Sequence, residues 1–116
     1  MAMLLSACST MTASDLSLLQ HQVFAVEHAF ARGKAERKFD DFVRPLSEHA
    51  VSFGSRDVRR CKADVAARWK LFHADPQAPF SWEPDQMEVS PDGLLAHASG
   101  AVRDPTGKLI SQFNSI

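Results

Sequence analysis

The chain has 116 residues, which is enough for one domain with one hydrophobic core. Hydrophobic residues make up 45% and charged residues 23%, as in ordinary globular domains, and the formal net charge is −1. Nucleic-acid binding is not expected, because this balance supplies no field for attracting phosphates and the basic stretch at residues 56–62 has no interleaved aromatic side chains.

The first residues read MAMLLSACST, in which LSAC (residues 5–8) resembles the lipobox of bacterial lipoproteins. The apolar run before Cys8 is shorter than a complete signal core, and no Lys or Arg precedes it. We interpret residues 1–13 as a truncated lipoprotein-type signal and linker, with Cys8 as the lipidation site. This predicts an exported, periplasmic or membrane-anchored protein whose only membrane contact is the lipid. The alternative is a chance match in a cytoplasmic protein.

A first helix is expected to begin at Ser14, which can cap it, with Asp15 in its first turn and its end at Gly33. Steps of three and four residues place one apolar stripe on it: Leu16, Leu19, Val23, Val26 and Phe30. A solvated, charged surface is indicated by the basic cluster and the acids that follow it: Arg32, Lys34, Arg37, Lys38, Asp40 and Asp41.

Shorter elements follow the first helix. The apolar spacing of residues 39–46 predicts a second helix, which Pro45 should kink or end. The segment HAVSFG (49–54) reads as a short strand, and RDVRR (56–60) is its expected partner. A third helix is predicted over residues 62–73, because Val65, Trp69 and Phe72 share one of its faces.

Two similar turn sequences, SPDG (90–93) and DPTG (104–107), predict a three-stranded antiparallel sheet. Each has proline at the second position and glycine at the fourth, as in type I turns. The strands are expected at 80–89, 94–103 and 108–116. Pro84 cannot donate to a ladder, which indicates an edge strand or a bulge. Helices grouped before an antiparallel sheet predict an α+β domain.

Four stretches of the sequence in this order resemble the nuclear transport factor 2-like superfamily, which includes SnoaL-like cyclases and ketosteroid isomerase. They are VEHAFARGKAERKFDDFV, EHAVSFG, VRRCKADVAARW and SWEPDQMEVSPDGLLAHASG, and they are most similar to the domain of unknown function 4440 family. The resemblance implies a cone-shaped domain over residues 14–116, with three N-terminal helices packed on a curved antiparallel sheet. It also implies one more long strand after GKLISQFNSI, so we interpret the sequence as a fragment in which the C-terminal strand is missing.

Catalysis of the ketosteroid isomerase type is not expected. The resemblance places its base at Phe53 or Gly54, neither of which takes up a proton, and the chain contains no tyrosine. His97 is then the main candidate general acid or base, although strand alternation does not tell which face of the sheet lines a cavity. Glu27 is a second candidate, at the cavity mouth, paired with Arg68, or exposed on the rim.

The expected site is an apolar cavity without an identifiable catalytic pair. Its predicted ligand contacts are Phe53, Trp69, Phe72, Trp82, Met87, His97 and Phe113. This predicts a domain that binds a small apolar or amphipathic molecule and that forms a homodimer through its sheet. The alternatives are a SnoaL-like lyase, cyclase or isomerase that uses His97, and a module whose sheet binds another protein. No cofactor and no metal are expected, because the histidines show no ligand-pair spacing.

Overall fold

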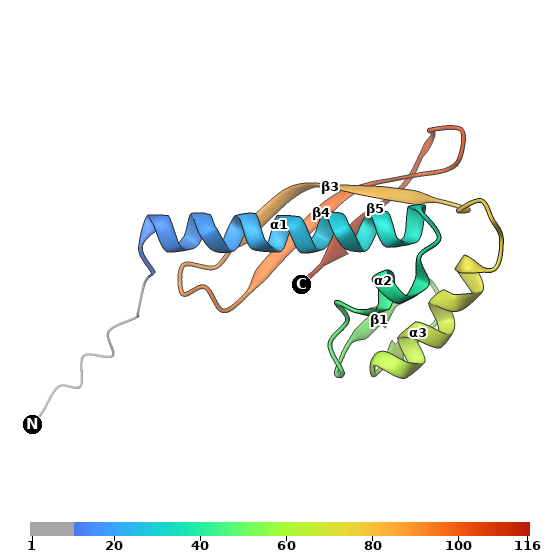
Figure 1. Ribbon diagram of the computed structural model, residues 1–116, viewed down its shortest axis with the longest axis horizontal. Helices are drawn as coiled ribbons and strands as arrows, with labels where there is room; N and C mark the ends of the chain where they lie inside the picture. Colours follow the sequence, from blue (N-terminus) through green and yellow to red (C-terminus); the bar gives the residue numbers. More distant parts are fainter. Residues whose placement is uncertain (1–10) are drawn as a thin grey trace, which may run out of the picture.

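The computed structural model describes residues 11–116 and shows helices followed by an antiparallel sheet (Figure 1). The elements are α1 (Ala13–Ala35), α2 (Phe39–Val43), β1 (Val51–Phe53), β2 (Val58–Arg60), α3 (Lys62–Lys70), the 3-10 helix η1 (Leu71–His73), β3 (Ser81–Val89), β4 (Ala96–Arg103) and β5 (Leu109–Ser115). The predicted α+β class is confirmed. The predicted lipidation site Cys8 lies outside the described residues. Within residues 11–116, no helix combines the length and the hydropathy of a membrane span.

Thr12 caps α1 in place of the predicted Ser14. The Thr12 backbone is extended, and its hydroxyl oxygen accepts a hydrogen bond from the backbone N–H of Asp15 at 3.2 Å. The same hydroxyl donates to the Asp15 carboxylate at 2.7 Å. Ser14 lies inside the first turn, so the prediction was two residues late. The acidic Asp15 also favours this end of the helix, because the first turn carries the positive end of the helix dipole.

The predicted end of α1 at Gly33 is wrong, because the helix continues two residues beyond it. A β-carbon on Gly33 would lie 2.8 Å from the backbone nitrogen of Phe42, so the glycine allows close packing of α1 on α2. The helix ends instead at Ala35, and Arg37, two residues later, has a left-handed φ of 62°. The N–H of Arg37 donates to the Lys34 carbonyl at 3.2 Å, and that of Lys38 donates to the Gly33 carbonyl at 2.8 Å. This is the Schellman arrangement.

The short elements between α1 and the three-stranded sheet agree with those predicted from the sequence. α2 ends two residues before Pro45, which has no N–H to continue a helical ladder. β1 and β2 pair as the predicted antiparallel hairpin, with Phe53 opposite Val58. α3 and η1 together cover the predicted third helix, and Val65 is buried on its inner side.

The three-stranded sheet has the order β3-β4-β5, with both neighbouring pairs antiparallel. Each predicted turn is closed by its glycine: the Gly93 N–H donates to the Ser90 carbonyl at 2.8 Å, and the Gly107 N–H donates to the Asp104 carbonyl at 2.9 Å. Both glycines have positive φ, 72° and 89°, which explains why a residue without a β-carbon stands there.

Pro84 interrupts the ladder between β3 and β4 as predicted. β3 is an edge strand, and the pairing register shifts between Pro84 and Gln86, which is a β-bulge. Opposite the bulge, a β-carbon on Gly100 would overlap the carbonyl oxygen of Glu83. Glycine at this position therefore allows the two strands to approach closely.

α1 lies across β3 and β4, and α2 and α3 lie beside its C-terminal half (Figure 1). The sheet face turned toward α1, called here the inner face, carries Trp82, Met87, Ala98, Gly100, Val102 and Phe113. The hydrophobic core is formed where this face meets the helices, by the buried residues Ala31, Phe42, Trp82 and Val102.

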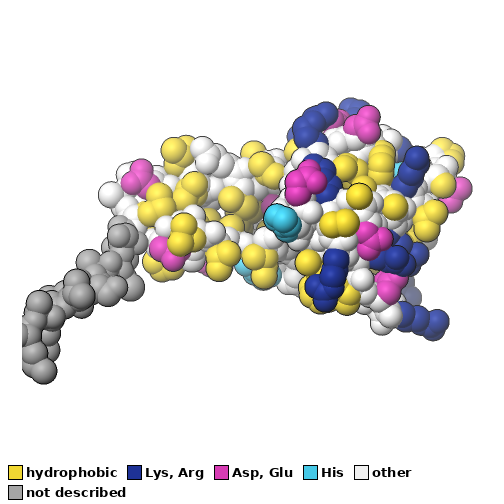
Figure 2. Space-filling model, turned by 90° about the horizontal axis from the view of Figure 1, so that it is seen from below, with side chains coloured by type: hydrophobic (Ala, Val, Ile, Leu, Met, Phe, Trp, Pro, Cys, Tyr) yellow, Lys and Arg dark blue, Asp and Glu magenta, His cyan; other side chains and the backbone are white. Residues whose placement is uncertain are grey.

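The N-terminal half of α1 and the turn between β3 and β4 extend away from the core. Met11, two residues before α1 begins, donates its N–H to the carbonyl oxygen of Pro91 in this turn at 3.0 Å. Hydrophobic side chains are exposed over this part of the molecule (Figure 2), among them Leu18, Phe24, Leu94 and Leu95. The functional groups described below lie at the other end, where α2 packs on α1 and α3 packs on α2.

Candidate ligand-binding site

The side of α1 that faces the sheet carries ionisable groups as well as hydrophobic ones. The predicted stripe is wrong at Val26, which is 52% exposed, and Glu27 turns inward beside it. Glu27, Phe30 and Lys34 follow one another at steps of three and four residues, so they share one helix face. Glu27 and Lys34 are roughly 10 Å apart along the helix axis. The inner side of α1 therefore presents an acid, an aromatic ring and an amine in sequence.

Aromatic rings from five elements and the loop before β3 meet at the core. This aromatic cluster consists of Phe30, Phe42, Trp69, Phe80, Trp82 and Phe113. Phe30 stacks on Phe42 with centroids 4.5 Å apart, and Trp82 stacks on Phe113 at 5.0 Å. Phe42 is fully buried and also contacts Trp69 at 5.0 Å. Such pairs contribute about 0.5–1.5 kcal/mol each beyond the burial of their area, so the centre of the cluster is firmly packed.

Lys34 is fully buried, which contradicts its predicted place on a solvated face. Its ammonium lies 3.6 Å from the ring centroid of Phe80, and about 6 Å from those of Trp69 and Trp82. Its Nζ donates a hydrogen bond to the Phe80 carbonyl oxygen at 2.8 Å. Burial, and to a smaller degree the charge of Arg37, lower the pKa of Lys34 from 10.5 to about 8. The aromatic faces replace part of the lost hydration.

Arg37 of the predicted basic cluster is also half-buried. Its guanidinium donates to the carbonyl oxygens of Phe72 and, at 2.9 Å, of Asp75, so it joins the end of α1 to the segment after α3. Nearby, Nδ1 of His73 lies 3.0 Å from the Trp69 carbonyl oxygen, and burial lowers the pKa of His73. The positions of Arg37 and His73 were not predicted from the sequence. Their partners are backbone carbonyl groups, and no sequence pattern reveals which carbonyl a side chain will contact.

Four buried side-chain atoms have no hydrogen-bond partner among the described residues: Glu27 Oε2, His28 Nε2, His73 Nε2 and Trp82 Nε1. Trp82 lies in the aromatic cluster itself. The other carboxylate oxygen of Glu27, Oε1, accepts a hydrogen bond from Ser115 Oγ at 2.7 Å. Arg68, the alternative partner of Glu27, lies instead over the ring of Phe72, 5.4 Å from its centroid. Glu27 and Trp82 thus place an unsatisfied acceptor and an unsatisfied donor in the interior.

The structure brings together most of the predicted ligand contacts. Three of them belong to the aromatic cluster: Trp69, Trp82 and Phe113. Phe72 borders the cluster, with its ring centroid 5.4 Å from that of Trp69 and 5.6 Å from that of Phe80. Met87 lies on the inner face, opposite Ala98 in the register of β3 and β4. Phe30, Phe42 and Phe80 complete the cluster and were not predicted as contacts.

Two predicted contacts lie apart from the cluster. Phe53 on β1 is 81% exposed. His97 is exposed and pairs with Glu88 on the outer face of the sheet, because its neighbour Ala98 points inward and side chains alternate along a strand. His97 Nε2 lies 3.0 Å from Asn114 Oδ1. The structure therefore separates His97 from Glu27, its suggested catalytic partner, by the thickness of the sheet.

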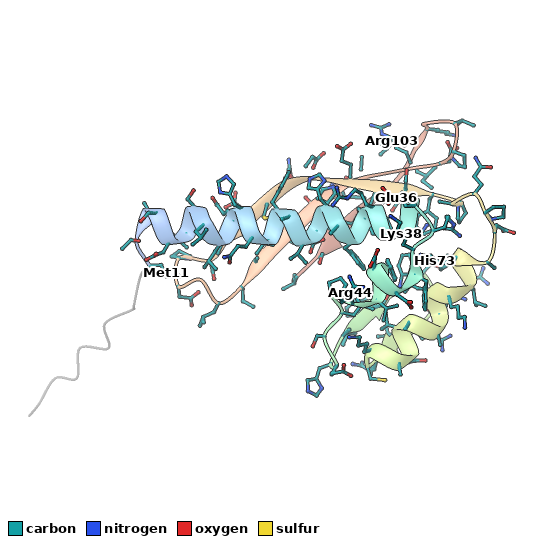
Figure 3. All side chains as sticks on the ribbon, viewed as in Figure 1. Met11, Glu36, Lys38, Arg44, His73 and Arg103 are labelled. Carbon is teal, nitrogen blue, oxygen red and sulfur yellow. The ribbon has the colours of Figure 1, made fainter. Side chains whose placement is uncertain are left out.

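Two surface grooves flank the C-terminal end of α1. One, of about 510 Å³, is lined by Ala35, Pro76, Gln77, Ala78, Phe80, Ser81 and Pro105. The other, of about 620 Å³, is lined by Val26, Ala29, Arg32, Gly33, Glu36, Lys38, Asp41, Arg44 and Pro45. On its rim Lys38 pairs with Glu36 and Arg44 pairs with Asp41, both at 2.9 Å. Figure 3 labels Glu36, Lys38 and Arg44. These pairs already neutralise most of the charge that this second groove could offer a ligand.

No metal site is present within residues 11–116, where no three His, Cys, Asp or Glu side chains converge to hold an ion. The groups at the core that could contact a ligand are aromatic faces, the Trp82 indole N–H, the Glu27 carboxylate and the Lys34 amine. They suit a small molecule with an apolar body and a few polar atoms.

The fold is nuclear transport factor 2-like. The chain is similar to the crystal structure of a nuclear transport factor 2-like protein of unknown function from Pseudomonas putida KT2440, with a TM-score of 0.61 and 18% sequence identity over 82% of this chain. The match spans 65% of the length of that protein. No family model matches the chain, and no curated protein is similar to it. The narrower resemblance to the domain of unknown function 4440 family stays a prediction.

Proposed function

We propose that this domain binds a small, largely apolar molecule between α1 and the inner face of the sheet, beside the aromatic cluster. The observation that carries this proposal is the Trp82 indole N–H, which is buried without a hydrogen-bond partner among the described residues. A buried donor left unsatisfied costs about 1–3 kcal/mol, so groups of this kind are normally paired with protein, water or a ligand. A hydrogen-bond acceptor on the ligand would satisfy it.

Glu27 supplies the second polar contact of the proposed site. It lies one helical turn before Phe30, whose ring meets both Trp82 and Phe113. Its bond to Ser115 holds the carboxylate at the inner face, and its second oxygen remains available there. A ligand that donates a hydrogen bond to Glu27 at one end and accepts one from Trp82 at the other fits this arrangement. A hydroxylated ring system with a carbonyl group is one such class.

Entry to the site requires movement of the rings at its edge. Phe30 and Phe113 are only half-buried, whereas Trp82 and Phe42 are buried, so we expect Phe30 and Phe113 to move more readily. The opposing strand β4 presents small side chains here, at Ala96, Ala98 and Gly100. The outer face, with His97, plays no part in this site.

Native mass spectrometry of the protein and a binding screen with small hydroxy-ketones test the proposal. We expect a bound species that is lost, or weakened at least about tenfold, in Trp82→Phe and in Glu27→Gln, since each removes one hydrogen bond to the ligand. His97→Gln is the matched control and should leave binding unchanged. A protein that shows no bound species by either method, or one whose binding depends on His97 and not on Trp82, would refute the proposed site.

A further inference from the structure

We propose that Lys34 is the reactive amine of a covalent site, which forms an imine with a small aldehyde or ketone. The carbonyl compound enters through the groove of about 510 Å³ between the end of α1, the loop before β3, and Pro105. The amine lies roughly 10 Å from Glu27 along α1 and shares only the Trp82 ring with the proposed binding site, and it adds a chemical activity to the proposed binding function.

The surroundings of Lys34 differ from those of an ordinary structural lysine. Its Nζ makes one hydrogen bond, to the Phe80 carbonyl oxygen, and no carboxylate lies within 4.0 Å of it among residues 11–116. Its neighbours are three aromatic faces and the like charge of Arg37. A fully buried ammonium without a counter-ion is costly, and such lysines release their proton readily.

Phe80 connects the buried amine to the surface. Its ring lies 3.6 Å from Lys34 Nζ and also lines the groove, and the side chain is half-buried. Ala35, the residue after Lys34, lines the same groove. A rotation of the Phe80 ring would therefore open the groove to Nζ without unfolding of α1. The other groove walls offer the polar side chains of Gln77 and Ser81 to an incoming carbonyl compound.

Formation of the imine requires only the Lys34 amine and the carbonyl compound, and it releases one water molecule. Lys34 first gives up its proton to water, and the neutral amine attacks the carbonyl carbon to form a carbon–nitrogen bond. The resulting carbinolamine loses water, leaving a carbon–nitrogen double bond, and hydrolysis reverses the sequence. With a pKa of about 8, about a tenth of Lys34 is neutral at pH 7, against roughly one part in three thousand for an unperturbed lysine. The apolar walls favour the neutral amine as well.

Reductive trapping on the full chain tests this inference. Propanal and sodium cyanoborohydride are added at pH 7, and the alkylated lysine is located by peptide mass mapping. We expect Lys34 to react at least about tenfold faster than the exposed Lys70 and Lys108, with a rate that rises toward a midpoint near pH 8. Alkylation of Lys70 and Lys108 with Lys34 untouched would overturn the proposal.

Variants at Phe80 separate a gated site from labelling through unfolding. Phe80→Leu and Phe80→Ala should speed the alkylation of Lys34 several-fold, whereas Phe53→Ala, which removes an exposed ring on β1, should not. Circular dichroism establishes whether each variant is folded. If Phe80→Ala does not fold, Phe80→Leu alone is used for the test. The hydrogen-exchange rate of the buried Phe42 amide reports how often this part of the protein unfolds. If Lys34 is alkylated no faster than that amide exchanges, then only unfolding exposes Lys34, and the proposal is overturned. Glu27→Gln, roughly 10 Å from Lys34 along α1, should leave the trapping intact, so failure of the binding site and failure of the covalent site are distinguishable.

Discussion

Gly33 of α1 lies directly against the backbone of Phe42, so that a β-carbon on Gly33 would be 2.8 Å from the Phe42 nitrogen and 3.1 Å from its α-carbon. Both partners are backbone atoms, which have no rotamer to move away, and α2 itself would have to shift. We expect Gly33→Ala to lower the free energy of unfolding by about 1–3 kcal/mol, despite the better helix propensity of alanine. Urea denaturation followed by circular dichroism measures this change in the free energy of unfolding.

The exposed position 25 of the same helix provides the control. Ala25→Gly should cost about 1 kcal/mol from propensity alone, because no element packs on it. If Gly33→Ala stabilises the protein by a similar amount, then α1 and α2 do not meet as closely as described.

The buried Lys34 predicts a stability that rises with pH. Its folded pKa of about 8 lies below its unfolded value of 10.5, so the unfolded chain binds more protons between these values. The free energy of unfolding should therefore increase from about pH 8 to about pH 10.5, by an amount on the order of 3 kcal/mol. Below pH 8 the penalty for the buried charge is fully present. Denaturation series across this range measure the slope.

Lys34→Met tests whether this slope comes from Lys34. The methionine keeps an apolar side chain of similar length in the aromatic cluster, and the rise in stability above pH 8 should disappear. Lys38→Met, at an exposed lysine, should retain the rise. An unchanged slope in Lys34→Met would show that another group titrates.

Phe42 and Phe53 differ most among the phenylalanines in their surroundings. Phe42 is fully buried and contacts three rings of the aromatic cluster, whereas Phe53 is 81% exposed. We expect Phe42→Ala to cost about 3–5 kcal/mol and Phe53→Ala less than about 0.5 kcal/mol. A large effect at Phe53, measured by thermal or urea denaturation, would place that ring in a packed site.

The role of Cys8 as a lipid anchor stays a prediction. In cells that process bacterial lipoproteins, Cys8→Ala should move the protein from the membrane fraction to the soluble fraction, since a lipid chain is the proposed attachment. Cys61→Ala is the matched control and should not change the distribution. Equal fractionation of Cys8→Ala and the parent would exclude the anchor.

The parts of the fold that the sequence predicted well are those specified by local chemistry. Proline and glycine in the two turns determined the ends of the strands, and Pro84 indicated both the edge strand and the bulge. The end of α1 was misplaced because Gly33 was interpreted as a helix terminator. Its actual partner, the backbone of α2, is nine residues away in sequence and invisible to local rules.

The candidate site was predicted in part, for a related reason. Trp69, Trp82 and Phe113 were found because aromatic residues at inward positions generally meet in the core. Lys34 was missed because a lysine in a basic run is usually solvated. The signal was nevertheless present, since Lys34 follows Phe30 by four residues on the helix face that packs against the sheet. The face of His97 could not be predicted, because alternation alone does not tell inner face from outer.

The indole N–H of Trp82 gives the most direct test of the proposed binding function. In a 15N-labelled Trp69→Phe variant, Trp82 is the sole tryptophan, so its indole resonance is identified without ambiguity. We predict that this resonance shifts when the protein is stripped of bound small molecules and shifts back when a hydroxy-ketone ligand is added, while the exposed His97 ring is unaffected. A Trp82 resonance that stays unchanged through stripping and through the whole ligand screen would contradict the proposal.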